Sequence, residues 1–248
     1  FSVPSGSKLA IVGPTGSGKS SLFNAFLRLL EPQSGSIVID GWNIGRIGLE
    51  DLRSRLYLVP QDPVILSGTL RSVLDVLGEF DDAKLLACLE AVHLVTDDNS
   101  AGKSPFSNLD MPIAENGSNL SQGQRQLLCV ARALLHKSRI VLFDEASSCI
   151  DYTTDMRITE TVHQVFDKCT VITIAHRLRT VIGYDKVMYM DHGKIMELDE
   201  PAKLLDDKSS HFYRLCKQTG PAEFQFLVEA AKQAASKRQA PPTIAASS

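Results

Sequence analysis

The sequence has 248 residues, which is enough for one large domain or two of modest size. Hydrophobic residues make up 44% of it and charged residues 22%, as is ordinary for a globular chain with a buried core. The net charge of −3 gives no overall attraction to nucleic acid or to an anionic membrane surface. No apolar run approaches the roughly 20 residues that cross a bilayer, and no signal peptide is visible. Because the chain begins at Phe1 without a methionine, we expect a fragment of a longer protein.

Five cysteines are scattered along the chain, and no two of them form a CxxC pair. Their odd number and spacing predict reduced, mostly buried thiols of a cytosolic protein rather than disulfides or a zinc site. They are Cys88, Cys129, Cys149, Cys169 and Cys216.

Short, almost continuously apolar segments recur along the chain, and several are followed by a helical pattern. Such segments are typical of strands in a sheet that is covered on both faces. The predicted strands are residues 9–12, 37–39, 57–59, 140–143 and 171–175. Two further strands, 186–190 and 194–198, flank Asp191-His192-Gly193, whose turn residues predict a hairpin.

Helices are predicted at residues 19–30, 82–92, 121–136, 153–166 and 201–206. In the first of them, Leu22, Phe26 and Leu29 stand at positions i, i+4 and i+7, as a buried face requires. The layout predicts an α/β fold with strands at both ends of the sequence. Between them we expect a mainly helical insert from about Ser67 to about Lys137.

Two segments are predicted to lie at the surface. Residues 97–108 are polar and rich in Ser, Asn and Gly, which indicates a mobile loop. After Gly220 the composition changes, and an amphipathic face is followed by basic residues and then by a tail, 241–248, that we expect to be disordered. Either this terminal helix packs on its own domain, or it docks on a partner or a membrane surface. The apolar face consists of Phe224, Leu227, Val228 and Ala231.

The strongest chemical signal is the segment from Gly13 to Ser20, which matches GxxxxGK[ST] between a predicted strand and a predicted helix. Gly16 and Gly18 allow the backbone to wrap closely around phosphate oxygens. Lys19 supplies a charge to the β- and γ-phosphates, and Ser20 can ligate Mg²⁺. The predicted phosphate-binding residues are Gly13, Pro14, Thr15, Gly16, Ser17, Gly18, Lys19, Ser20 and Ser21.

Further candidate residues follow the other predicted strands. The strand 140–143 ends in Asp144, which can hold Mg²⁺, and Glu145, which can polarise the attacking water as a general base. His176 follows another strand and is placed to contact a γ-phosphate. Gln61 ends a strand in the same way and can reach Mg²⁺ or water. Taken alone, Asp144 and Glu145 could be two solvated acids at a strand end, and His176 could be a structural histidine. The presence of the phosphate loop favours the chemical roles instead.

The segment Leu120-Ser121-Gln122-Gly123-Gln124 opens a predicted helix, where a serine is an N-cap by default. Placed between Gln61 and Asp144, it closely resembles the signature motif of ABC ATPases. With the phosphate loop, Glu145, Ser148-Cys149-Ile150-Asp151 and His176, it resembles the complete run of motifs of that family over residues 3–220. Residues 60–64, 67–71 and 125–133 resemble, more narrowly, the second ATPase domain of subfamily C exporters, the multidrug-resistance-associated type.

The resemblance implies a P-loop NTPase fold: an ABC ATPase core with a mostly parallel sheet and a helical subdomain. It implies an ATPase domain over residues 1–220, with its helical subdomain at about 67–137, and a helical or disordered tail over 221–248. It further implies that ATP and Mg²⁺ are bound and that ATP is hydrolysed to power export. The parent protein would be a membrane exporter with this domain on the cytoplasmic face, and nucleic acid would not be a partner.

The resemblance also implies two protein partners. In the family, two ATPase domains close head to tail around two ATPs, so Ser121, Gly123 and Gln124 would contact the ATP held by the partner domain, and Asp151 would lie near nucleotide. The helical insert would couple to transmembrane domains. Two departures stand out: Gln122 occupies a position where Gly is commonest, and the aromatic residue that stacks on adenine is expected before Phe1.

Two other functions compete with the transporter. One is a soluble ABC ATPase that acts on nucleic acid or ribosomes; about 100 residues separate Lys19 from Ser121, without the sustained heptads of a long coiled coil. The other is a regulatory module that does not hydrolyse ATP, against which Glu145 and His176 argue.

Overall fold

The computed structural model describes residues 1–95, 104–144, 152–175 and 177–239, except for the side chains of 152–158 and 239. The chain divides into two compact units. The first unit comprises Phe1–Gly6 and Ser20–Ile172, and the second comprises Ser7–Lys19 and Thr173–Ser248.

The second unit is built on strands in the order β10-β9-β1-β8. Strand β1 (Lys8–Val12) runs parallel to β9 (Lys186–Asp191), from Leu9 opposite Lys186 to Val12 opposite Tyr189. Strand β10 (Lys194–Asp199) is antiparallel to β9, so the predicted hairpin is confirmed. β8 (Thr170–Ile174) crosses the boundary between the units. Leu9 through Val12 are buried, because strands covered on both faces must be apolar throughout.

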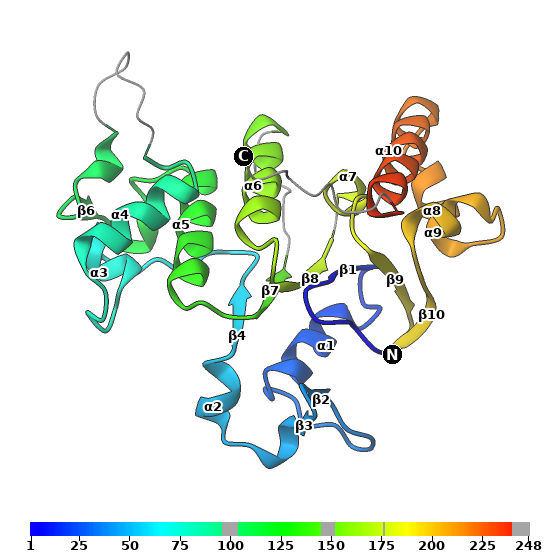
Figure 1. Ribbon diagram of the computed structural model, residues 1–248, viewed down its shortest axis with the longest axis horizontal. Coiled ribbons are helices and arrows are strands. Elements are labelled where there is room, and N and C mark those ends of the chain that lie inside the picture. The colour runs from blue at the N-terminus through cyan, green and yellow to red at the C-terminus, as the bar shows by residue number, and fades with distance from the viewer. Residues whose placement is uncertain (96–103, 145–151, 176, 240–248) are drawn as a thin grey trace, which may run out of the picture. The chain divides into compact units, whose positions relative to one another are not determined.

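Within its described residues the second unit also contains four helices: α7 (Leu178–Val181), α8 (Pro201–Asp206), α9 (His211–Lys217) and α10 (Pro221–Gln239). α10 packs against α8 and α9, with Leu227 and Ala231 buried (Figure 1). This confirms the alternative in which the terminal helix packs within its own part of the chain. Glu197 on β10 caps α9 by accepting hydrogen bonds from the backbone N–H of His211 (2.5 Å) and of Phe212 (3.1 Å).

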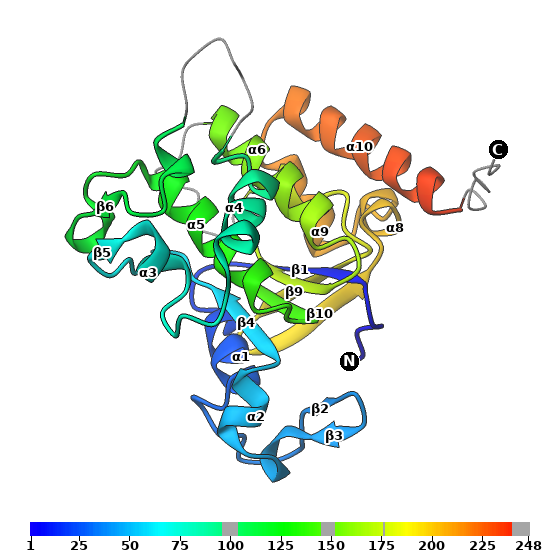
Figure 2. The ribbon, with the colours of Figure 1, turned by 60° about the vertical axis from the view of Figure 1, so that its left-hand side comes forward.

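In the first unit, β4 (Leu56–Val59) pairs in parallel with β7 (Ile140–Asp144), and the strand order is β8-β7-β4. Helices α3, α4 and α5 gather beside β6, and α1, α2 and the β2–β3 hairpin lie apart from them (Figures 1 and 2). The helices are α1 (Lys19–Phe26), α2 (Leu49–Arg53), α3 (Leu70–Leu74), α4 (Asp82–Ala91), α5 (Gln122–Leu135) and α6 (Tyr152–Val165). The short strands are β2 (Val38–Ile39), β3 (Trp42–Asn43), β5 (Gly68–Thr69) and β6 (Pro112–Ile113).

One prediction of local structure is wrong, and another is corrected in the part that the structure describes. The first helix ends at Phe26 rather than Leu30, because Arg28 adopts a left-handed conformation (φ +50°) that terminates it. Leu29 is therefore 58% exposed, and the buried face consists of Phe23, Phe26 and Leu27. The predicted mobile loop lies largely outside the described residues, but its last part forms a 3₁₀ helix, Pro105–Ser107, that buries Phe106.

Four of the five cysteines fall within the described residues, and all four are free thiols, as predicted. Cys129 and Cys216 are buried, and burial raises the pKa of Cys216 to about 12. Cys149 lies outside the described residues.

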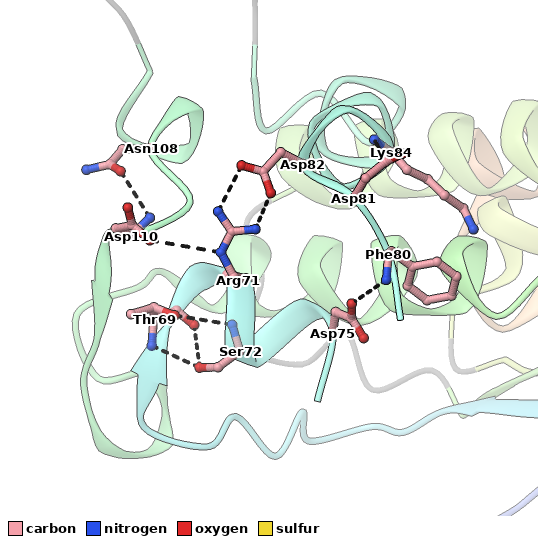
Figure 3. Close-up of polar contacts among 10 residues, drawn as sticks. All are labelled: Thr69, Arg71, Ser72, Asp75, Phe80, Asp81, Asp82, Lys84, Asn108 and Asp110. Atoms are coloured by element: carbon pink, nitrogen blue, oxygen red, sulfur yellow. Dashed lines mark hydrogen bonds and ion pairs between the residues drawn. The ribbon is translucent and has the colours of Figure 1, made fainter. Parts of the chain in front are cut away.

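The loop between α3 and α4 is organised by one carboxylate. Asp75 accepts a hydrogen bond from the backbone N–H of Phe80 at 2.8 Å (Figure 3). Burial alone would raise the pKa of Asp75, but the backbone N–H groups of residues 77–80 outweigh burial and hold that pKa below its usual range. Beside it, Arg71 donates two hydrogen bonds to Asp82, which joins the start of α3 to the start of α4.

We predict that Asp75→Asn destabilises the protein by about 1–3 kcal/mol at pH 7, because an amide accepts hydrogen bonds more weakly than a carboxylate. Since the pKa of Asp75 is lowered on folding, its contribution is present above its unfolded-state pKa and is lost as pH falls through the folded value. The difference between wild type and variant should therefore shrink below about pH 4 in urea-unfolding experiments.

The matched control is Asp81→Asn, since Asp81 caps α4 through the N–H of Lys84 and asparagine caps equally well. This control should stay within about 0.5 kcal/mol of wild type at both pH values. A pH-independent loss in the Asp75 variant would contradict the role assigned to its charge.

Candidate nucleotide-binding site

The glycine-rich loop directly follows β1 in the second unit. Gly13, Gly16 and Gly18 have φ values of +144°, +79° and +99°, a region that side chains of L residues rarely enter. A Cβ atom at Gly13 would lie 2.0 Å from the carbonyl oxygen of Met190, whereas a Cβ at Gly16 would meet nothing within 4 Å. Gly13 is thus required by the protein's own packing, and Gly16 leaves open space at the loop's outer surface.

Lys19 lies at the end of this loop and begins α1. Its ammonium group donates to the carbonyl oxygens of Gly13 and Pro14, both at 2.8 Å, and only 7% of the residue is exposed. The loop therefore carries a buried positive charge. Pro14, Thr15, Gly16, Ser20 and Ser21 are exposed, and Ser17 is buried.

Two residues that the sequence did not connect with the phosphate loop support it. The N–H of Gly193 donates to the carbonyl of Ser17 at 3.0 Å, and the carbonyl group of Met190 lies against Gly13. Both follow from the parallel register, because Val12 opposite Tyr189 brings the residues after β1 beside those after β9. The sequence contained the hairpin but no signal for which strand would neighbour β1.

Gln61 follows β4, and Asp144 ends β7, which is the strand paired with β4 in the first unit. Val59 pairs with Phe143, so the residues that follow β4 and β7 leave the sheet at the same end. Asp144 is half-buried and Gln61 is exposed. The register thus places both residues at the carboxyl ends of neighbouring parallel strands, and their role at a metal ion stays a prediction.

The predicted signature segment opens α5, as expected. The hydroxyl of Ser121 accepts from the N–H of Gln124 at 3.2 Å, and the Gln124 side chain accepts from the N–H of Ser121 at 2.9 Å. This reciprocal capping box satisfies two amides that the first turn leaves unpaired. Ser121 is exposed and Gly123 is buried.

Three predicted site residues, Glu145, Asp151 and His176, lie outside the described residues. Among the residues that are described, no group of three or more His, Cys, Asp or Glu side chains could hold a metal ion. A metal site built from them would have to draw on other oxygen donors.

A glycine-rich loop between a buried parallel strand and a helix that begins with a buried lysine defines a P-loop nucleotide-binding protein. The family model described as ABC transporter matches residues 1–148. The chain is 43% identical to the ATP-dependent bile acid permease of Saccharomyces cerevisiae, over 94% of the chain and 15% of that protein. It belongs to the ABC transporter family, as a nucleotide-binding domain of the subfamily C type.

Other relatives agree with this assignment. The chain is 46% identical to human ATP-binding cassette sub-family C member 4, over 96% of the chain and 18% of that protein. It is 47% identical to mouse sub-family C member 3, over 89% of the chain and 14% of that protein. The chain thus spans less than a fifth of the length of each of these relatives. The permease and the sub-family C members among the relatives give no support to the alternative of an ATPase acting on nucleic acid or ribosomes.

The fold is also shared with a solved exporter. The structure of a bacterial Atm1-family ABC exporter with ATP bound matches 89% of this chain and 38% of its own chain, with a TM-score of 0.78 and 30% identity. This confirms the predicted ABC ATPase fold. Within the described ranges, no helix combines the length and the apolar character that crossing a bilayer needs.

The two glycine environments in the loop predict different costs of substitution. Gly13→Ala forces a Cβ atom against the Met190 carbonyl at a positive φ, so we expect it to destabilise the protein by more than about 2 kcal/mol. Gly16→Ala bears only the backbone strain, about 1–2 kcal/mol. Thermal and urea unfolding of the two variants measures the difference.

Gly183→Ala is the control, because a Cβ atom at Gly183 would meet nothing within 4 Å and its φ is not positive. It should be neutral or slightly stabilising. Equal destabilisation by Gly13→Ala and Gly16→Ala would mean that the Met190 carbonyl does not constrain the loop.

Proposed function

We propose that this chain is the ATP-hydrolysing motor domain of a membrane exporter and works at the cytoplasmic face of the membrane. The observation that carries the proposal is the loop after β1, with three positive-φ glycines and the buried ammonium group of Lys19. Successive backbone N–H groups and the start of α1 favour an anion there. The β- and γ-phosphates of ATP are the natural ligand, with Lys19 turning from loop carbonyls to phosphate oxygens.

Mg²⁺ fits the donor set of this chain. Ser20, Gln61 and Asp144 offer a hydroxyl, an amide and a carboxylate oxygen, the hard ligands that Mg²⁺ prefers, and Ser20 and Gln61 are exposed. When bound, Mg²⁺ would neutralise phosphate charge. In this proposal Glu145 polarises the attacking water as general base, His176 contacts the γ-phosphate, and Asp151 lies near nucleotide.

We propose further that a second ABC ATPase domain pairs with this chain head to tail. Ser121, Gly123 and Gln124 would then contact the partner's ATP. Two features support this role: Ser121 is exposed, and it caps a 14-residue helix whose positive end favours phosphate. Because its hydroxyl oxygen accepts the capping bond, the hydroxyl proton stays available to donate to a phosphate oxygen.

Glu145→Gln is the test of the hydrolytic role. The amide cannot take a proton, so turnover in the full-length protein should fall about 10²–10⁴-fold while Mg-ATP binding is retained. Steady-state ATPase assays and equilibrium binding measure the two quantities. Glu90→Gln, an exposed residue of α4, is the control for loss of one charge. Near-normal hydrolysis by Glu145→Gln would contradict the role of Glu145 as general base.

An apolar groove of about 350 Å³ in the first unit is the proposed contact for the transmembrane domains. Its rim carries Val64, Leu66, Val76 and Leu77, all largely exposed, and Leu77 is 76% exposed. The groove is lined by Tyr57, Val64, Leu66, Leu74, Asp75, Val76, Leu77, Glu79, Phe80, Arg132 and His136. Several exposed aliphatic side chains around one hollow favour a protein partner over water.

Side-chain contacts hold the walls of the groove together. Arg132 on α5 donates from Nε to the carbonyl of Val73 at 2.6 Å, and the Tyr57 ring packs on His136 with centroids 5.3 Å apart. Burial raises the pKa of Tyr57 to about 12, so this side chain stays neutral. The Asp75 loop holds the segment that bears Val76 and Leu77. A preformed hollow with an apolar rim suits a short helix presented by a membrane domain.

Leu77→Asp tests this contact. The side chain is exposed, so the free energy of unfolding should be unchanged, within about 0.5 kcal/mol. A charge on the rim should nevertheless reduce transport by the full-length protein about tenfold or more, because a buried unpaired carboxylate weakens docking. Val38→Asp, which changes an exposed aliphatic residue (58%) outside the groove, is the control. Normal transport by Leu77→Asp would exclude the groove as the contact.

A further inference from the structure

The one-turn helix α7 is held by a side chain of the terminal helix α10. Arg179 donates from Nε to Oε1 of Glu223 at 2.6 Å and from Nη2 to Oε2 of the same carboxylate. This is a two-bond ion pair between residues 44 positions apart, and both side chains are about two-thirds buried or more. Its hydrogen bonds hold the pKa of Glu223 below the usual range, so the carboxylate is charged at neutral pH.

A second residue of α10 contacts the same guanidinium. The ring of Phe226 lies under Arg179, with the guanidinium carbon 4.2 Å from the ring centroid. Glu223 and Phe226 are three residues apart and so share one face of α10. The carboxylate of Glu223 thus binds the edge of the Arg179 guanidinium, and the ring of Phe226 packs against its flat face.

The far end of the same segment is fixed separately. Arg238, near the end of α10, donates to the carbonyl oxygens of Gly183 at 3.2 Å and Tyr184 at 3.0 Å. Asp185 accepts from the N–H of Lys8 at 2.8 Å and donates its own N–H to the Lys8 carbonyl at 3.0 Å. These bonds tie the end of the segment to the start of β1, the strand that leads into the phosphate loop.

Helix α7 needs such support, because four residues make too few internal hydrogen bonds to be stable alone. We propose that α10 is an intramolecular brace for residues 177–185, and that Arg179 and Glu223 are positioning residues for ATP hydrolysis. The kinetic part rests on the proposed function, since Arg177 directly follows His176 in the chain.

Because the Arg179–Glu223 pair and the Asp185–Lys8 bonds hold different ends of the segment, loss of the pair should affect turnover and nucleotide affinity differently. Breaking the Arg179–Glu223 pair frees α7 at its beginning, where the chain arrives from residue 176. The bonds of Asp185 to Lys8 still hold β1 and therefore the phosphate loop. Loss of the pair should accordingly lower kcat and leave the KM for ATP nearly unchanged.

The test compares Glu223→Arg, the swapped double variant Arg179→Glu with Glu223→Arg, and Glu229→Arg. Glu229 is an exposed residue of the same helix, bonded to Gln225, and controls for the change of charge. Hydrogen exchange is followed at the N–H groups of Ile182 and Tyr184, which donate to Leu178 and Val181. The N–H of Leu204 in α8 is the internal reference.

In Glu223→Arg we expect Ile182 and Tyr184 to exchange about five- to tenfold faster, with Leu204 unchanged. We expect kcat to fall by about fivefold or more, with KM within about twofold. The swapped variant should recover most of both losses, and Glu229→Arg should show neither.

Unchanged exchange in Glu223→Arg, or no recovery in the swapped variant, would overturn the brace. Faster exchange with unaltered kcat would overturn the positioning role. If the wild-type protein does not hydrolyse ATP, the proposed function fails, whereas the exchange rates still decide whether the brace exists.

Discussion

The parallel pairing of β1 with β9 is the constraint on which the nucleotide site depends. With Val12 opposite Tyr189, the chain leaving β1 runs beside the chain leaving β9. The Met190 carbonyl then occupies the place of a side chain at Gly13, and the N–H of Gly193 pairs with Ser17. The loop is thus shaped by its neighbour in the sheet before any ligand arrives, which lowers the ordering cost of binding.

Much of the fold was predictable because local sequence patterns indicate its strands and helices. Each predicted strand is found within one or two residues, because apolar runs mark strands locally. The predicted environment is wrong for residues 37–39: β2 pairs with β3, outside the main sheet, and Val38 is 58% exposed. The elements that were missed, among them α3, α7 and the two-residue strands β5 and β6, are too short for any periodicity to be visible. The sequence prediction placed the end of α1 too late, because the apolar spacing continues to Leu29. The left-handed residue that ends the helix is Arg28 rather than a glycine, so the sequence gives no signal for it.

The site divides in the same way. Sequence spacing identified the phosphate loop, the residues after β4 and β7, and the serine that caps α5, because each signal lies within a few neighbouring residues. The roles of Glu145, Asp151 and His176 remain predictions. Contacts between distant residues were beyond the sequence: nothing in it connects Arg179 with Glu223, or Asp185 with Lys8. Such pairs are determined by how helices and strands pack, not by their spacing.

The central claim is that the loop after β1 binds the phosphates of ATP through Lys19. Calorimetric titration of the protein with Mg-ATP, beside Lys19→Ala and the exposed control Lys194→Ala, tests it most directly. Removing a charged donor to phosphate should weaken binding about 10- to 100-fold, and Lys194→Ala should bind as wild type does. Equal affinity for Mg-ATP in Lys19→Ala and wild type would contradict the account.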